Sequence, residues 1–284
     1  MKEYKSTHDL LVYLESKNVI IKNREQAIKK IERYSYYSII NSYKSVFKER
    51  SNDYKQQVSF EEIFALYEFD KNIKSIFLKY ILEIELMIKS LMANLLAKNY
   101  GLEHYLKIEN FDNYKNEQLI SKLIDTINHE VDSNKKHDAV KHYRNKYGFV
   151  PPFVLTKVLT FGMISKYYGL LKQRDRQQIS KYFKLSDNLL AQILRNLTLV
   201  RNISAHSDRL FCFSSNMYVS LKGIIKKYEG YINLYVIIQC MGLLLDNQEY
   251  DEFVVSFNKE IENLKEKLSS IDIDDILNIM GYDL

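Results

Sequence analysis

The sequence predicts an all-α protein, a bundle of about ten helices. Only two prolines and eight glycines occur in 284 residues, whereas β folds need many tight turns that these residues supply. Apolar residues recur at helical spacing along most of the chain, with no alternating strand pattern, so we expect no β-sheet. Hydrophobic residues make up 46% and charged residues 27% of the chain. This is an ordinary globular balance and argues against disorder.

The N-terminal half is expected to contain two short helices, over residues 7–17 and 24–34, followed by one long helix. Before the long helix, aromatic side chains are spaced for a packed helix face over residues 31–47, IERYSYYSIINSYKSVF. The long helix starts with a capping box, Ser59 to Glu62, and ends near Gly101, with one break at most. Residues 117–147 give one or two more polar helices.

Pro151 and Pro152 form the strongest break in the chain and are the best candidate for a domain boundary. They divide an N-terminal helical part, 1–150, which holds the long helix, from a C-terminal helical part, 151–284. We expect the two parts to form one integrated domain. Further helices are predicted over residues 153–172, 175–182, 187–206, 217–228, 231–246, 250–268 and 273–280. The last has Asp272 as its N-cap and Gly281 as its stop.

Charge and cysteine content limit the classes of partner. The formal net charge of +5 permits a nucleic-acid partner without requiring one. Cys212 and Cys240 are isolated, which disfavours structural zinc and a disulfide framework and fits a reducing compartment. The longest uncharged apolar run, residues 230–245, is too short to span a bilayer, and the N-terminus does not read as a signal peptide. We therefore expect a cytoplasmic protein without membrane association.

The stretch LVRNISAHSDRLF, residues 199–211, interrupts the apolar pattern with polar side chains that are costly to bury unpaired. Ser186 can cap the helix that precedes it. Four polar residues then fall on one helix face, at steps of seven, four and three: Arg195, Asn202, His206 and Arg209. Arg201 lies about 140° from His206 on an ideal helix. A helix end near Ala205, a π-bulge, or a second copy of the site across a two-fold axis would bring Arg201 and His206 together.

The chemistry of this cluster is limited by the residue types it contains. The cluster has no adjacent carboxylate pair for Mg²⁺, and the sequence contains no HExxH, no GxSxG and no Gly-rich phosphate loop. An imidazole can exchange a proton with a 2′-hydroxyl or a 5′-oxygen, and guanidinium groups can hold a phosphate. These groups suit metal-free cleavage of RNA rather than DNA, because the reaction uses the 2′-hydroxyl. The alternative is a solvated helix end that carries no catalysis.

The segment RNISAH, residues 201–206, resembles the R-x4-6-H motif of HEPN domains (higher eukaryotes and prokaryotes nucleotide-binding). Four segments between residues 10 and 212 are similar to one bacterial branch, the Abi-like proteins (abortive infection, AbiD/AbiF-type): IERYSYYSIINSYKSVF, FEEIFALYEFDKNIKSIFLKYILEIEL, VPPFVLTKVLTFGMISKYYGLL and RNISAHSDRLF. The resemblance implies a HEPN-like helical bundle with N-terminal and C-terminal helical extensions. It also implies a metal-independent, cofactor-free endoribonuclease of phage defence or toxin–antitoxin type. The partners it implies are a second copy of the chain and a small non-coding RNA.

The resemblance implies roles for particular residues. Arg201, Asn202 and His206 are the expected catalytic residues. The expected RNA contacts are Arg209, Arg195 and Lys157. Glu85 or Glu83, in the long helix, either orients the motif arginine or is an ordinary solvated carboxylate. Two departures from the family pattern occur: Phe153 replaces the usual Trp, and Lys157 replaces the usual Glu, which weakens an orienting interaction or adds an RNA contact.

Three functions therefore compete. The leading one is an endoribonuclease that damages cellular or phage RNA during infection. The second is a non-catalytic HEPN module that holds a structured RNA. The third is a helical scaffold that binds proteins, in which the polar cluster only caps a helix.

Overall fold

A computed structural model describes residues 4–112, 117–217, 219, 221 and 232–282, and the chain is all-α, as predicted. Its α-helices, in chain order, are α1 (Thr7–Glu15), α2 (Arg24–Tyr34), α3 (Phe60–Tyr100), α4 (Glu117–Ser133), α5 (Asp138–Tyr147), α6 (Pro152–Val158), α7 (Phe161–Leu170), α8 (Gln173–Ser180), α9 (Asp187–Ala205), α10 (Leu234–Gly242), α11 (Asn247–Lys265) and α12 (Ile273–Met280). A π-helix, η1 (Tyr37–Asn41), and three 3₁₀ turns, η2 (Lys44–Phe47), η3 (Ile108–Asn110) and η4 (Lys181–Phe183), lie between them.

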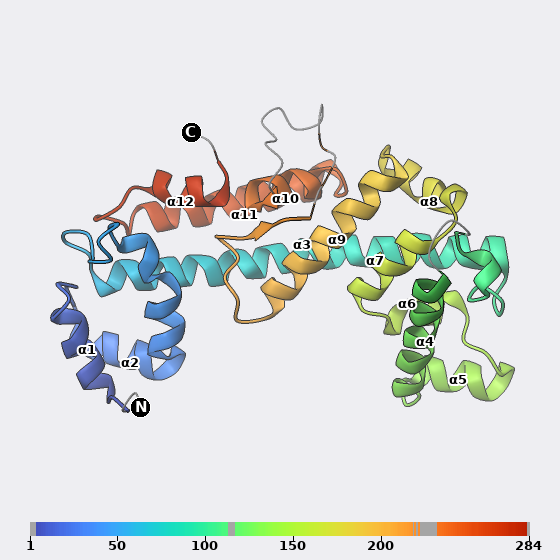
Figure 1. The fold of residues 1–284 in the computed structure, drawn as a ribbon, viewed down its shortest axis with the longest axis horizontal. Coiled ribbons are helices and arrows are strands. Elements are labelled where there is room, and N and C mark those ends of the chain that lie inside the picture. The colour runs from blue at the N-terminus through green and yellow to red at the C-terminus, as the bar shows by residue number, and fades with distance from the viewer. Residues whose placement is uncertain (1–3, 113–116, 218, 220, 222–231, 283–284) are drawn as a thin grey trace.

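Helix α3 is the axis of the molecule and runs along its longest dimension (Figure 1). The predicted capping box is present: the Ser59 hydroxyl accepts the N–H of Glu62, and the Glu62 carboxylate accepts the N–H of Ser59. The helix ends at Gly101, whose φ of 77° glycine adopts without strain. Both predicted ends are confirmed, and the helix is unbroken.

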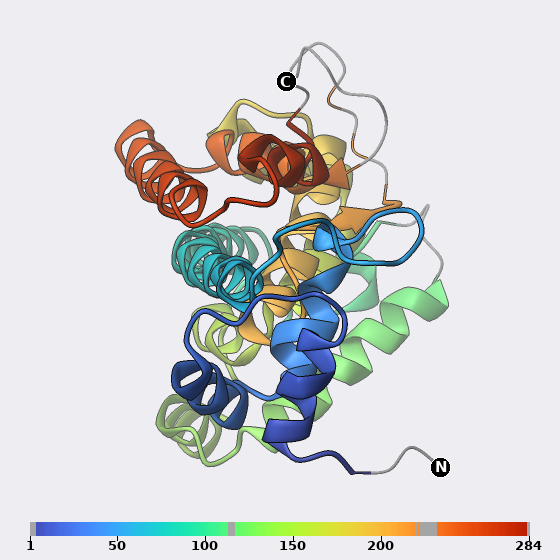
Figure 2. The same ribbon diagram turned by 90° about the vertical axis from the view of Figure 1, so that its left-hand side faces the viewer.

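Helices from both ends of the chain pack against α3. Figure 2 shows the C-terminal helices on one side of α3 and the N-terminal helices on the other. Phe77 of α3 makes edge-to-face contacts with Phe253 and Phe257 of α11, at centroid distances of 5.1 and 5.9 Å. Helices α6, α7, α8 and α9 also contact α3. One cluster of buried apolar side chains therefore includes residues from before and after Pro151.

The helix predicted over residues 24–34 is confirmed as α2, whereas the helix face expected over residues 31–47 and the helix predicted over residues 153–172 are both divided. Helix α2 ends at Tyr34 because Ser35 has a φ of +66°, a left-handed conformation that interrupts the helical hydrogen bonding. Residues 37–47 then form short π and 3₁₀ turns instead of one helix. The helix predicted over residues 153–172 is two helices, because Thr160 is extended and its hydroxyl caps α7 by accepting the N–H of Met163.

The expectation of no β-sheet is wrong in one place. Strand β1 (Ser214–Ser215) pairs with β2 (Ile232–Asn233) in an antiparallel sheet. The chain is extended at these residues, after the end of α9. The strand pairing gives their backbone groups the hydrogen bonds that a helix would otherwise supply. The helix predicted over residues 217–228 falls mostly outside the described residues.

The C-terminal helices follow the predicted order with shifted ends. Helix α10 is shorter than predicted, and Asp246 starts α11 in a capping box with Glu249. Helix α12 has the predicted N-cap, Asp272, and stops at Gly281 with a φ of 94°. Of the helices described, none combines the length and hydropathy needed to cross a membrane.

Candidate functional site

The candidate site forms where α9 ends. The helix begins as predicted, with the Ser186 hydroxyl accepting the N–H of Leu189, and it stops at Ala205. His206 is the C-cap, with extended backbone dihedrals of −118° and −175°. Of the three arrangements that the sequence left open, the structure of the single chain shows the helix end, but this end leaves Arg201 outside the depression that contains His206.

Asn202, His206 and Arg209 line one open depression of about 370 Å³ at this helix end. All three residues are exposed. The depression is completed by Leu199, Ile203, Asp208, Cys212, Phe213 and Ser214. An amide, an imidazole and a guanidinium group thus border the same space, which is the donor set expected for a phosphate ligand.

Arg201 lies apart from this depression and reaches helix α3 instead. Its Nε lies 3.7 Å from Oε2 of Glu85, and the Oε1 of Glu85 lies 2.7 Å from Nζ of Lys89. The contact with Glu85 is an ion pair too long for a hydrogen bond, and neither Arg201 Nε nor Glu85 Oε2 has a hydrogen-bond partner among the described residues. The Arg201 side chain is one-third exposed. Part of the Arg201 side chain therefore remains accessible beside the helix end, although its Nε is buried.

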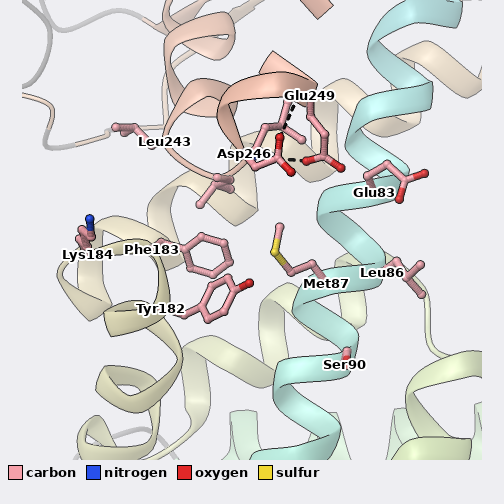
Figure 3. A pocket seen from close by; sticks show the side chains of 12 residues that line it. Glu83, Leu86, Met87, Ser90, Tyr182, Phe183, Lys184, Leu243, Asp246 and Glu249 are labelled. Atoms are coloured by element: carbon pink, nitrogen blue, oxygen red, sulfur yellow. Dashed lines mark hydrogen bonds between the residues drawn. The ribbon is translucent and has the colours of Figure 1, made fainter. Parts of the chain in front are cut away.

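Glu83, the other carboxylate considered for Arg201, lies in a different pocket. Figure 3 shows Glu83 on α3 near the turn that starts α11, where Asp246 and Glu249 are hydrogen-bonded to each other's backbone. Two positions along a helix change direction by about 200°, so Glu83 and Glu85 face different neighbours. Glu85 is the carboxylate that the fold places beside Arg201.

The structure does not bring Arg195 or Lys157 to the depression. Arg195 is exposed on α9, its Nε donates to the carbonyl of Ala191 at 3.3 Å, and it lines a separate cavity between α4, α7 and α9. Lys157 is exposed on α6 and is not among the residues that line the depression. Phe153, the other departure from the family pattern, is exposed and contacts the ring of Tyr143.

Sequence reasoning missed Asp70, which holds the chain just after His206. This fully buried residue of α3 accepts the N–H groups of Leu210 and Phe211 through Oδ1, at 2.9 and 2.7 Å. Its Oδ2 accepts the hydroxyl of Tyr43 at 2.7 Å. Burial raises the pKa of Asp70, although these hydrogen bonds act against the rise. The sequence signal that could have identified Asp70 is its position, as a carboxylate, within the apolar face of α3.

Two further contacts hold the segment that carries Arg209. The ammonium group of Lys74 donates to the carbonyl of Asp208 at 3.1 Å, and one guanidinium nitrogen of Arg209 donates to the carbonyl of Ser42 at 2.5 Å. A guanidinium has five N–H donors, so Arg209 keeps donors for a ligand. The loop after α9 is thereby attached to α3 and to the segment after η1.

Cys212 is not suited to act as a nucleophile in this depression. Burial raises the pKa of its thiol, which keeps it protonated at neutral pH. Proton transfer by a histidine is therefore the chemistry that the lining residues best support. Within the described ranges, no three His, Cys, Asp or Glu residues gather in a way that could hold a metal ion.

The fold and this site define the chain as an all-α protein with an arginine–histidine motif at the end of a core helix. It belongs to the Abi-like protein family, whose model matches residues 29–212. The match runs from α2 through the whole depression except Phe213 and Ser214. Membership associates the protein with abortive infection, the form of phage defence to which the family name refers.

One curated protein is also similar to this chain, the "Repetitive organellar protein" of Plasmodium falciparum (isolate 3D7). The two are 24% identical over 247 residues, which is 79% of this chain and 12% of that protein. The chain therefore spans only a small part of this relative. No solved structure matches the chain.

Proposed function

We propose that this protein is a HEPN endoribonuclease that acts in abortive infection or as the toxin of a toxin–antitoxin pair. The observation that carries the proposal is the depression at the end of α9. It gathers Asn202, His206 and Arg209 in one accessible place, and all three lie inside the region that the family model matches.

In the proposed reaction, the 2′-oxygen of a ribose attacks the adjacent phosphorus while a histidine accepts the 2′-hydroxyl proton. The bond from phosphorus to the 5′-oxygen breaks, and that oxygen takes up a proton. The products are a 2′,3′-cyclic phosphate and a 5′-hydroxyl end. Arg209 and Arg201 stabilise the negative charge on the phosphate, and Asn202 contacts the substrate or the imidazole. The reaction uses no metal ion.

The proposed active form is a homodimer. One chain offers a single motif histidine, whereas this reaction uses both a base and an acid. The chain also separates Arg201, beside Glu85, from the depression that contains His206. Two copies related by a two-fold axis would place two histidines and two arginines around one phosphate, and such isologous dimers are common. A structured non-coding RNA is the proposed regulatory partner.

The position of Arg201 also supports a second candidate function. Because Arg201 is paired with Glu85 and stands outside the depression, the site of one chain lacks the complete motif. A HEPN module that binds structured RNA without cleaving it would need only accessible donors such as Asn202 and Arg209.

Incubation of the purified protein with total RNA in excess EDTA separates the two functions. The endoribonuclease predicts cleavage with 2′,3′-cyclic phosphate ends in the wild type and none in His206→Ala. His129→Ala is the matched control, because His129 is an exposed histidine on α4 that does not line the depression. Retained RNA without cleavage would support the binding module, and activity restored only by Mg²⁺ or Mn²⁺ would contradict the proposed chemistry.

A further inference from the structure

A second cavity, of about 470 Å³, lies between α4, α7 and α9. Its volume is within the range of about 300–1,000 Å³ that is usual for small-molecule sites. It shares no lining residue with the depression that contains His206. It is therefore a separate candidate site.

Positive charge converges on this cavity from three helices. Lys122 of α4, Lys166 of α7 and Arg195 of α9 all line it and are exposed, and no Asp or Glu is among its lining residues. None of the ion pairs in the described part of the chain involves these three side chains. A fourth cation lines the cavity, Arg176 of α8, but it is already paired with two aspartates. Its guanidinium nitrogens lie 3.2 Å from Oδ2 of Asp112 and 3.1 Å from Oδ2 of Asp187. The three cations would therefore attract an anion bound in this cavity.

The inner wall of the cavity is apolar. It is formed by Leu123, Met163 and Leu170. At Gly169 an added Cβ would meet no atom within 4 Å, so the wall is open at this point. Ser165 also lines the cavity, and its buried hydroxyl has no hydrogen-bond partner among the residues that the structure describes. A buried hydroxyl without a partner is costly, and a polar atom of a ligand could satisfy it.

We propose that this cavity binds a small amphipathic organic anion, with a phosphate or carboxylate group held by Lys122, Lys166 and Arg195. The apolar body of the ligand packs against Leu123 and Met163. Lysine and arginine side chains are the usual partners of such anions. The limited volume of the cavity, with apolar side chains lining it beside the cations, favours a compact ligand over an extended RNA strand. The proposal does not depend on the ribonuclease activity.

Calorimetric titration with 1-naphthyl phosphate tests the proposal, because this probe joins an apolar body to a phosphate. Inorganic phosphate and 1-naphthol are the control ligands, because the first lacks the apolar body and the second lacks the phosphate. We expect each to bind at least tenfold more weakly than 1-naphthyl phosphate. Equal affinity for inorganic phosphate would show an unspecific charged surface and would overturn the proposal, as would no binding of the probe at millimolar concentration.

Variants separate the cavity from the rest of the surface. Lys166→Gln and Arg195→Gln should each weaken binding of the probe at least tenfold, whereas Lys141→Gln, a change at an exposed lysine of α5, should not. Gly169→Leu should abolish binding by filling the cavity, and Gly169→Ala should weaken it. Both replacements suit a helix better than glycine, and circular dichroism verifies the fold. Unchanged binding in all four cavity variants would refute the site.

A single-stranded RNA oligonucleotide is the last arm of the titration. RNA held at the depression or elsewhere on the surface would leave binding of 1-naphthyl phosphate unchanged. Displacement of the probe by the RNA, together with loss of RNA binding in Gly169→Leu, would identify RNA as the occupant and overturn the proposal of a small anion.

Discussion

Arg201 and Glu85 face each other across the contact between α9 and α3, with Nε of Arg201 3.7 Å from Oε2 of Glu85. The Glu85 side chain is largely buried, whereas Arg201 is one-third exposed. The ion pair therefore directs the arginine of the motif toward α3, while His206, beyond the helix end, borders the depression. Glu85 is in a position to set the orientation of Arg201 in a complete site.

Replacing Glu85 tests this orientation. If Glu85 positions Arg201, Glu85→Gln should reduce the rate of RNA cleavage about tenfold or more, because small displacements of a charged group lower catalysis strongly. RNA affinity, measured by filter binding, should change little. Glu83→Gln is the matched control and should behave as wild type, since Glu83 lies in a different pocket. An equal loss in both variants would contradict a positioning role for Glu85.

Removing Asp70 should loosen the segment that follows His206. Asp70→Ala deletes the acceptor of two backbone N–H groups and of the Tyr43 hydroxyl. Leaving these donors unsatisfied should lower the free energy of unfolding by about 3 kcal/mol, against about 1 kcal/mol for Tyr43→Phe. Urea denaturation measures both changes. Asp251→Ala, at an exposed acid on α11, should stay within about 0.5 kcal/mol of wild type. A wild-type value for Asp70→Ala would show that this anchor is dispensable.

The stability of the protein should depend on pH through Glu62. Burial alone would raise the pKa of this carboxyl, but hydrogen bonds from Ser270, Ser269 and Ser59 outweigh burial and hold the pKa below its usual value of 4.5. Below that value the unfolded chain binds the proton more readily than the folded chain. The contribution of Glu62 is therefore complete above about pH 4.5 and is lost as the pH falls through the lowered pKa of the folded state.

The comparison with Glu62→Gln isolates this contribution from that of other acids. At pH 7 the variant should be less stable by about 2 kcal/mol, because a neutral amide replaces a charged acceptor. The difference from wild type should shrink as the pH falls from 5 to 3, as measured by chemical denaturation at each pH. A difference that stays constant over this range would contradict the lowered pKa.

A site built from two copies of the chain predicts that inactive chains lower the activity of wild-type chains. If two copies contribute to one site, mixing wild-type chains with an excess of His206→Ala chains should depress RNA cleavage below the value expected from dilution. Mixing with His129→Ala chains should not. Cleavage that is simply proportional to the fraction of wild-type chains would show that each chain works alone.

Sequence by itself determined the features that depend on neighbouring residues. The capping box of Ser59 and Glu62, the N-cap at Ser186 and the stop at Gly281 each involve residues within four positions of one another. Such signals are written directly in the sequence, because the hydrogen bonds they make are local. The apolar spacing of α3 is equally local, and it predicted the whole helix.

Some local signals were present but were hidden by a stronger pattern. Thr160 caps α7, yet apolar residues continue at helical spacing on both sides of it and suggested one helix. Ser35 has a left-handed conformation within an aromatic-rich segment that also suggested a continuous helix. The helical spacing of apolar residues shows which side chains are buried, but it does not show where the backbone turns.

Only the tertiary structure decided how the polar residues are grouped. The contact of Asp70 with Leu210 joins positions 140 residues apart, and the pairing of Arg201 with Glu85 instead of Glu83 depends on how α9 crosses α3. A sequence does not record which faces of two distant helices meet, because the packing of the whole core sets their rotation and crossing. Spacing along α9 predicted the shared face of Asn202 and His206, but the fold selected the neighbours of Arg201.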